Sequence, residues 1–194
     1  MASCKSVISL AREVDVPCLL PAAFYDLSRN SFAQILEPNE DDGFEPPPSP
    51  LSEQDMRRLC LGKEAAQHTI TTLIQSMGRS HFFRHTQKHP LNMHGKRVSF
   101  SICISAAACR KDFNELVNLA TQHYLFDRER GYCDPLYVAE ELGQLKSAEF
   151  SECKACAVAL ELWAAREREK MWKMIPYWFR LEPLGANTSS PPPA

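Results

Sequence analysis

The sequence has no long hydrophobic run. None of its apolar stretches approaches the roughly 20 residues that a membrane-spanning helix needs. The first twenty residues contain Glu13 and Asp15, whereas a secretory signal peptide would be uninterruptedly apolar there. We therefore expect an intracellular protein, cytoplasmic or nuclear, that does not use a membrane as a partner.

A large net charge is also missing. The chain of 194 residues carries a formal charge of -2, and its 44% hydrophobic and 24% charged residues are typical of a globular protein. Between residues 51 and 110, however, nine Lys and Arg side chains outnumber three Asp and Glu side chains. Arg79, Arg84, Lys88, Lys96 and Arg97 alternate there with histidines and phenylalanines. Such a mixture can contact phosphate and stack on bases, but it is equally typical of a solvated loop. Because the chain has neither a basic domain nor a nucleic-acid-binding motif, we do not expect a nucleic acid partner.

The N-terminal segment is predicted to form a helical hairpin over residues 1–36. Apolar residues recur there at helical spacing, and Pro17 separates two helices. Two short helices cannot bury broad apolar faces on each other alone. The rest of the chain, or a domain missing from its front, must cover them.

A linker is predicted over residues 37–50, and a disordered tail over residues 185–194. The linker, EPNEDDGFEPPPSP, combines acidic residues with five prolines, which remove backbone donors. A long loop inside one domain would explain the same composition.

Residues 51–184 are predicted to form a helical domain with paired cysteines. Its clearest helix runs from Glu53 to Gly78, because Ser52 can cap it and Asp55 lies three residues further on. Other helices are expected from Lys111 to Tyr124 and after a cap at Asp134.

The last helix is expected to begin near Cys153 and to end at Pro176, and an aromatic cluster follows it. Residues 98–104, VSFSICI, alternate as in a strand. The predicted fold class is therefore mainly α: an irregular helical domain with an N-terminal hairpin, a long C-terminal helix and at most one short extended segment.

Two cysteines stand at the start of that last helix. In SECKACAVALELWAARERE, Cys153 and Cys156 lie on one side of the helix, and Leu160 and Trp163 continue that side. Packing alone would explain both thiols. A redox role would require a thiol activated at a helix start that follows a strand, whereas the preceding residues favour a helix.

A second pair, Cys103 and Cys109, makes a metal site the sharper alternative. Eight cysteines without a secretory signal are expected to be reduced thiols or metal ligands. Two pairs brought together would supply the four thiolates of one structural zinc site, although five residues between Cys103 and Cys109 exceed the usual two to four. Cys133 or His123 could replace one member.

Other candidates carry weaker signals. His81, His85 and His89 repeat at intervals of four, but no glutamate accompanies them as in a metalloprotease helix, and Pro90 interrupts the region. Cys4 and Cys18 are expected to be ordinary thiols, and Cys60, on the apolar stripe of its helix, is expected to pack.

The order of the motifs resembles that of a known family. VISLAREVDVPCLLPAAFYDLSR, LSEQDMRRLCLGKE after an acidic loop, the paired cysteines, DPL, CKAC and MWKMIPYWFRLEP follow one another. This order is similar to the region C-terminal to the BTB/POZ domain in BTB/POZ-domain-containing proteins of mushroom-forming (basidiomycete) fungi. The resemblance implies an intracellular adaptor without a catalytic step. Nothing in the chain resembles the BTB core itself, so we expect a truncated member, a domain fragment or an incomplete gene prediction. BTB-type dimerisation and cullin-ligase recruitment would need the absent part.

The sequence thus predicts a non-enzymatic protein–protein interaction module with no catalytic residues and no small-molecule substrate. One structural zinc on Cys103, Cys109, Cys153 and Cys156 is its only candidate cofactor. A zinc-stabilised nucleic-acid-associated module is the alternative, and a thiol enzyme using Cys153 and Cys156 comes third.

Overall fold

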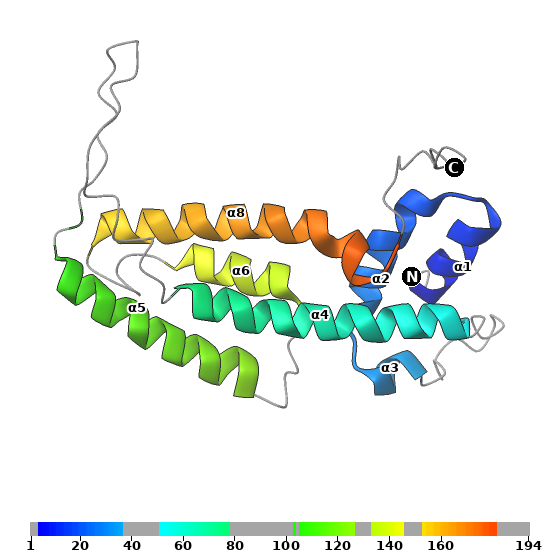
Figure 1. Cartoon of the computed structure of the whole chain (residues 1–194), viewed down its shortest axis with the longest axis horizontal. Helices are drawn as coiled ribbons and strands as arrows, with labels where there is room; N and C mark the ends of the chain where they lie inside the picture. Colours follow the sequence, from blue (N-terminus) through cyan, green and yellow to red (C-terminus); the bar gives the residue numbers. More distant parts are fainter. Residues whose placement is uncertain are drawn as a thin grey trace, which may run out of the picture. The chain divides into compact units, whose positions relative to one another are not determined.

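The computed structural model describes residues 4–36, 51–77, 103, 105–126, 133–145 and 153–181 (Figure 1). Every regular element in these ranges is helical, which confirms the mainly α fold class. The predicted linker and tail, the histidine repeat and the basic side chains from Arg79 to Arg97 lie outside the described residues. The predicted extended segment also does so, apart from Cys103.

The chain divides into two compact units. The first consists of residues 1–66 and 173–194, and the second of residues 67–172. The division falls within helices α4 (Glu53–Met77) and α8 (Lys154–Trp178). The predicted boundaries around the linker therefore do not coincide with the edges of these units, because the hairpin groups with the start of α4 and the end of α8.

The first unit begins with the predicted hairpin. Helix α1 (Cys4–Glu13) is followed by the 3-10 turn η1 (Pro17–Leu19) and by α2 (Leu20–Ser28), and the short helix α3 (Phe32–Leu36) comes after them. The end of α1 is a Schellman motif, in which Asp15 has a φ of 52° and the Val16 N–H donates to the Ala11 carbonyl at 2.8 Å. This turn lets Pro17 open the next helix.

The rest of the chain covers part of the hairpin, whereas Leu10, Val14 and Leu19 stay exposed. The Phe24 ring stacks on that of Phe179 with centroids 5.5 Å apart. The Lys63 ammonium is buried and donates to the carbonyls of Ser28 at 2.7 Å and Asn30 at 2.6 Å. These carbonyls lie at the end of α2, where helix groups need donors.

Helix α4 has the predicted start. The Asp55 N–H donates to the Ser52 hydroxyl at 3.1 Å, and this hydroxyl donates to the Asp55 carboxylate at 2.9 Å. The predicted apolar stripe is buried along much of the helix. Its fully or almost fully buried members are Leu59, Ile70, Leu73, Ile74 and Met77.

In the second unit, α5 (Ala106–Thr121) begins earlier than the predicted Lys111. The Ser105 hydroxyl caps it by accepting from the Ala108 N–H at 3.3 Å, and three alanines then favour the helix. A π-helical turn, η3 (Gln122–Phe126), continues α5. Helix α6 (Pro135–Gln144) has the predicted cap, since Asp134 accepts from the Tyr137 N–H at 3.0 Å.

The prediction that Pro176 ends the last helix is wrong, because α8 continues to Trp178. Proline removes only its own N–H, and burial of Ile175 and Phe179 in the core of the first unit stabilises the last turn. The following aromatic cluster is divided between core and surface: Phe179 and Leu181 are buried, whereas Tyr177 is exposed.

No described helix is both long enough and apolar enough to cross a lipid bilayer.

Candidate metal centre

The two predicted cysteine pairs meet in the second unit. The Sγ atoms of Cys103, Cys109, Cys153 and Cys156 all lie within 4.8 Å of one another. Cys103 Sγ is 3.5 Å from Cys109 Sγ and 3.7 Å from Cys156 Sγ. The four thiols can therefore bind one metal ion.

Helix starts bring these thiols together. Cys109 lies in the first turn of α5, and Cys103 precedes the Ser105 cap. Cys156 lies in the first turn of α8, and Cys153 precedes that helix, its carbonyl accepting from the Cys156 N–H at 3.0 Å. Each pair thus supplies one thiol from before a helix and one from its first turn.

The spacing of the thiols fits a tetrahedral ion. A Zn–S bond of about 2.3 Å corresponds to an S···S edge of about 3.8 Å in a regular tetrahedron. The Cys103–Cys109 and Cys103–Cys156 separations, 3.5 and 3.7 Å, are close to this edge. The longest of the six separations is at most 4.8 Å, about 1 Å more than the edge. A small contraction of the cluster would complete the coordination shell.

Burial controls the protonation of the cluster. Cys109, Cys153 and Cys156 are buried, and Cys103 is half-buried. Desolvation, followed by the hydrogen bond with Cys103, raises the pKa of Cys109 above its usual value. Desolvation, followed by the hydrogen bond with Cys109, raises the pKa of Cys156. A redox or nucleophilic cysteine needs the opposite shift. A bound cation would instead stabilise the thiolates.

Cys133 and His123, which were predicted as possible replacements for one of the four cysteines, lie outside the cluster. Cys133 is buried and accepts a hydrogen bond from the Gln67 side-chain amide at 3.6 Å. The His123 ring packs edge-on against Tyr124, with centroids 4.7 Å apart. Neither residue belongs to the group of four thiols.

The other cysteines fit their prediction as separate thiols. Cys4 donates to the Asp26 carboxylate at 2.7 Å, Cys18 is exposed, and Cys60 is half-buried. All eight cysteines are free thiols.

Helix α8 is closely packed beyond the cysteine cluster. Leu160 is completely buried as predicted, whereas Trp163 is only half-buried. A Cβ atom at Gly143 of α6 would lie 2.8 Å from the Ala164 Cβ of α8, so α6 approaches α8 closely at this point. Helix α8 can therefore pack through Leu160 and Ala164 and still supply Cys156 as a metal ligand.

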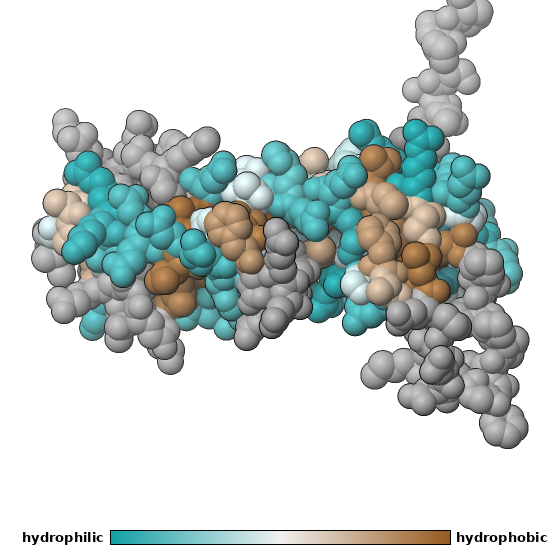
Figure 2. Space-filling model, turned by 90° about the horizontal axis from the view of Figure 1, so that it is seen from below, coloured by the Kyte–Doolittle hydropathy of each residue, from teal (hydrophilic) through white to brown (hydrophobic). Residues whose placement is uncertain are grey.

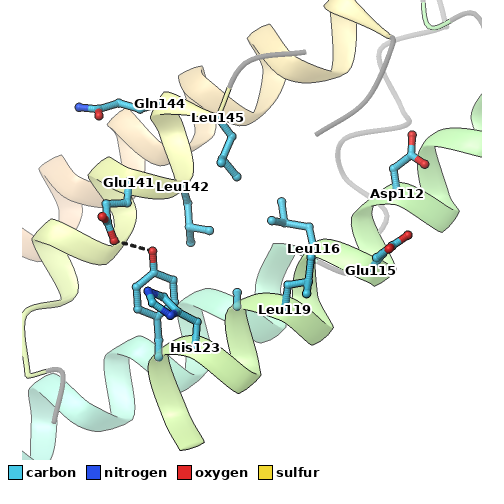
Figure 3. Close-up of a pocket in the computed structure, with 11 residues that line it drawn as sticks. Asp112, Glu115, Leu116, Leu119, His123, Glu141, Leu142, Gln144 and Leu145 are labelled. Atoms are coloured by element: carbon cyan, nitrogen blue, oxygen red, sulfur yellow. Dashed lines mark hydrogen bonds between the residues drawn. The ribbon is translucent and has the colours of Figure 1, made fainter. Parts of the chain in front are cut away.

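Sequence reasoning missed a hollow between α5 and α6 (Figure 3). Its volume is about 690 Å³. At one end the Tyr124 hydroxyl donates to Glu141 at 2.6 Å, and the Tyr137 hydroxyl donates to the other oxygen of the same carboxylate. Tyr124 and Glu141 are 17 residues apart, so no local spacing signals their contact.

Comparison of the chain with protein-family models, with curated proteins and with solved structures finds no match. The resemblance to BTB/POZ-domain-containing proteins therefore stays a prediction.

Proposed function

We propose that this chain is a non-catalytic helical module that binds another protein and is stabilised by one structural zinc ion. The observation that carries the proposal is the cluster of four cysteine thiols within 4.8 Å of one another. Thiolates are soft ligands, and a closed set of four is typical of structural zinc rather than of a catalytic site with an open position.

The surroundings of the cluster suit a zinc–tetrathiolate group. Four thiolates and Zn²⁺ carry a net charge of about -2. The starts of α5 and α8, which hold Cys109 and Cys156, each present a partial charge of about +0.5 to it. Zinc would then join the segment before α5 to the segment before α8, which are far apart in the sequence.

Two observations support an interaction role. Hydrophobic residues form separate groups among hydrophilic ones on the face shown in Figure 2. Among the described residues of the second unit, the exposed large hydrophobic side chains are Leu119, Phe126, Tyr137, Val158, Leu162 and Trp172. The order of the sequence motifs, which resembles the region following a BTB/POZ domain, also favours an intracellular adaptor. The reduced thiols that zinc needs favour a cytoplasmic or nuclear location for such an adaptor.

Elemental analysis of the purified chain tests the metal. We expect about one equivalent of zinc, a fall in melting temperature on chelation, and recovery of that temperature on adding zinc back. A folded, metal-free chain whose melting temperature does not respond to zinc would refute the proposal.

Proximity labelling in cells tests the interaction. A partner recovered with the parent chain should be lost with Cys156→Ser and retained with Cys133→Ser, which also replaces a buried thiol but lies outside the cluster. If the partner were recovered equally with both variants, its binding would not depend on the metal, and this part of the proposal would be refuted.

A further inference from the structure

The hollow between α5 and α6 has an apolar floor and an acidic border. Leu116 of α5, Leu142 of α6 and Leu145 point toward one another across it (Figure 3). Its other described lining residues include three carboxylates, and no lysine or arginine is among the residues that the structure describes there. We call this site the α5–α6 groove, defined by Asp112, Glu115, Leu116, Leu119, Glu141 and Leu142.

The carboxylates stand at opposite ends of the groove. Asp112 and Glu115 lie toward the start of α5, whereas Glu141 lies beside Tyr124 of η3 (Figure 3). Both oxygens of Glu141 accept hydrogen bonds from tyrosine hydroxyls, and Tyr124 is buried. The position of this negative charge is therefore fixed before any partner arrives.

The groove has the length of a short helix. From Asp112 to His123, eleven helical steps of about 1.5 Å span about 16 Å, or three turns of a partner helix. Leu119, in the middle of this span, is 61% exposed. Together with the apolar floor of the groove, this exposed leucine offers a surface on which the apolar face of a helix can pack.

We propose that the α5–α6 groove binds a basic amphipathic helix of a partner protein. The partner places apolar residues at positions i, i+4 and i+7 over Leu116, Leu119 and Leu142. Its lysine or arginine residues at the two ends meet Asp112 and Glu115 on one side and Glu141 on the other. Apolar burial supplies affinity, and charge complementarity supplies orientation and rate of association.

The same charges disfavour a nucleic acid in this groove, because three carboxylates repel phosphate. The inference rests on the proposed interaction role and specifies the partner's chemistry.

A displayed peptide library tests the groove. The library contains 16-residue helical peptides whose anchors vary among Leu, Ile, Met and Phe, and whose ends vary among Lys, Arg, Glu, Asp and Ser. It is panned against the full, zinc-loaded chain, and the binding of selected peptides is measured by fluorescence anisotropy. We expect enrichment of peptides with basic ends, and weaker binding as salt is raised.

Substitutions then locate the bound peptide. Leu119→Arg and Glu115→Arg should each weaken binding about tenfold, since each places a positive charge against a basic partner. Val158→Arg is the matched control: Val158 is 52% exposed on α8 and outside the groove, so binding should be unchanged. Circular dichroism and zinc content verify that each variant is folded.

Several results would overturn the proposal: no enrichment, enrichment of acidic ends, or binding that Leu119→Arg leaves intact. Binding that appears only after Arg79, Arg84, Lys88, Lys96 and Arg97 are replaced by serine would also overturn it, because the chain's own segment would then be the occupant. A zinc-loaded chain that selects no peptide refutes the groove alone. A folded, zinc-free chain that binds basic helices refutes the structural zinc and leaves the groove proposal intact.

Discussion

Gly62 of α4 lies so close to the Phe179 ring that a Cβ atom at position 62 would overlap it. Phe179 is completely buried and stacked on Phe24, so its ring has little room to move. A glycine in the middle of a 25-residue helix thus makes room for an aromatic ring from the far end of the chain.

Gly62→Ala should therefore lower the free energy of unfolding by about 1–3 kcal/mol through overpacking. Helix propensity alone predicts the opposite sign, a gain of about 1 kcal/mol. Urea denaturation measures the difference, and Glu64→Ala, an exposed site two residues away, is the control with little expected change. A more stable Gly62→Ala variant would mean that Phe179 does not occupy this position.

Arg180 ends α8 in a left-handed conformation, with a φ of 51°. The Leu181 N–H donates to the Pro176 carbonyl at 2.9 Å and completes a Schellman motif. Glycine adopts this φ without steric cost, so Arg180→Gly should raise the free energy of unfolding by about 0.5–1 kcal/mol. Thermal denaturation is the measurement. Asp15 has a φ of 52°, and Asp15→Gly should raise the free energy of unfolding by a smaller amount, because aspartate tolerates this region better than arginine.

Arg12 and Asp55 join α1 to α4 within the first unit. The Arg12 guanidinium holds both oxygens of a carboxylate that is only 4% exposed, with Nε 3.1 Å from Oδ2. Arg12→Ala should lower the free energy of unfolding by about 1.5–3 kcal/mol, since it removes hydrogen bonds to a buried charge. Arg29→Ala, which removes an exposed pair with Asp26, should change it by at most about 1 kcal/mol. Equal effects of the two substitutions on chemical denaturation would contradict this assignment.

Cys4 should react slowly with alkylating reagents near neutral pH. Desolvation, then the hydrogen bond to Asp26 and the charge of that carboxylate, raises the pKa of Cys4 from 9.0 to about 11. The reactive thiolate of Cys4 should therefore form with a midpoint near pH 11. Mass spectrometry of iodoacetamide-treated protein measures the rate at each pH.

Asp26→Asn should move the midpoint for Cys4 downward, whereas Asp15→Asn should leave it in place. Because the folded pKa is the higher one, the contribution of Cys4 to stability is complete below pH 9.0 and is lost as the pH rises through about 11. A midpoint that Asp26→Asn does not move would show that the carboxylate has no influence on this thiol.

Cobalt substitution tests the identity of the ligands. Cobalt bound by four thiolates in a tetrahedron absorbs strongly in the visible range, so the parent chain titrated with Co²⁺ should develop these bands. Cys109→Ser should lose most of this absorption, because it removes one of four ligands. Cys133→Ser should keep it, since Cys133 is hydrogen-bonded to Gln67 instead. If Cys133→Ser lost the bands and Cys109→Ser kept them, the proposed set of four ligands would be wrong.

Local patterns in the sequence determined the class of the fold and several helix boundaries. Ser52 and Asp134 cap the helices that follow them, and the predicted stripe of α4 is buried, because caps and periodicity depend on residues within a few positions. The four cysteines could be proposed as one site because thiols in pairs have few other uses in a reduced chain. Whether the pairs meet could not be read from the sequence.

Contacts between distant segments decided the rest. Pro176 stays helical because its neighbours Ile175 and Phe179 are buried, although the dipeptide pattern predicts a stop. The α5–α6 groove is bounded at one end by the hydrogen bond between Tyr124 and Glu141, which are 17 residues apart.

The sequence by itself thus determined that the chain is helical and which thiols are candidates, since backbone hydrogen bonds and amphipathic faces are local properties. Only the tertiary structure decided that four sulfur atoms converge, that Phe179 and Lys63 cover part of the hairpin, and that a groove with acidic ends opens beside α6. These depend on side chains that meet only when remote helices pack, and packing energies do not follow from spacing along the chain.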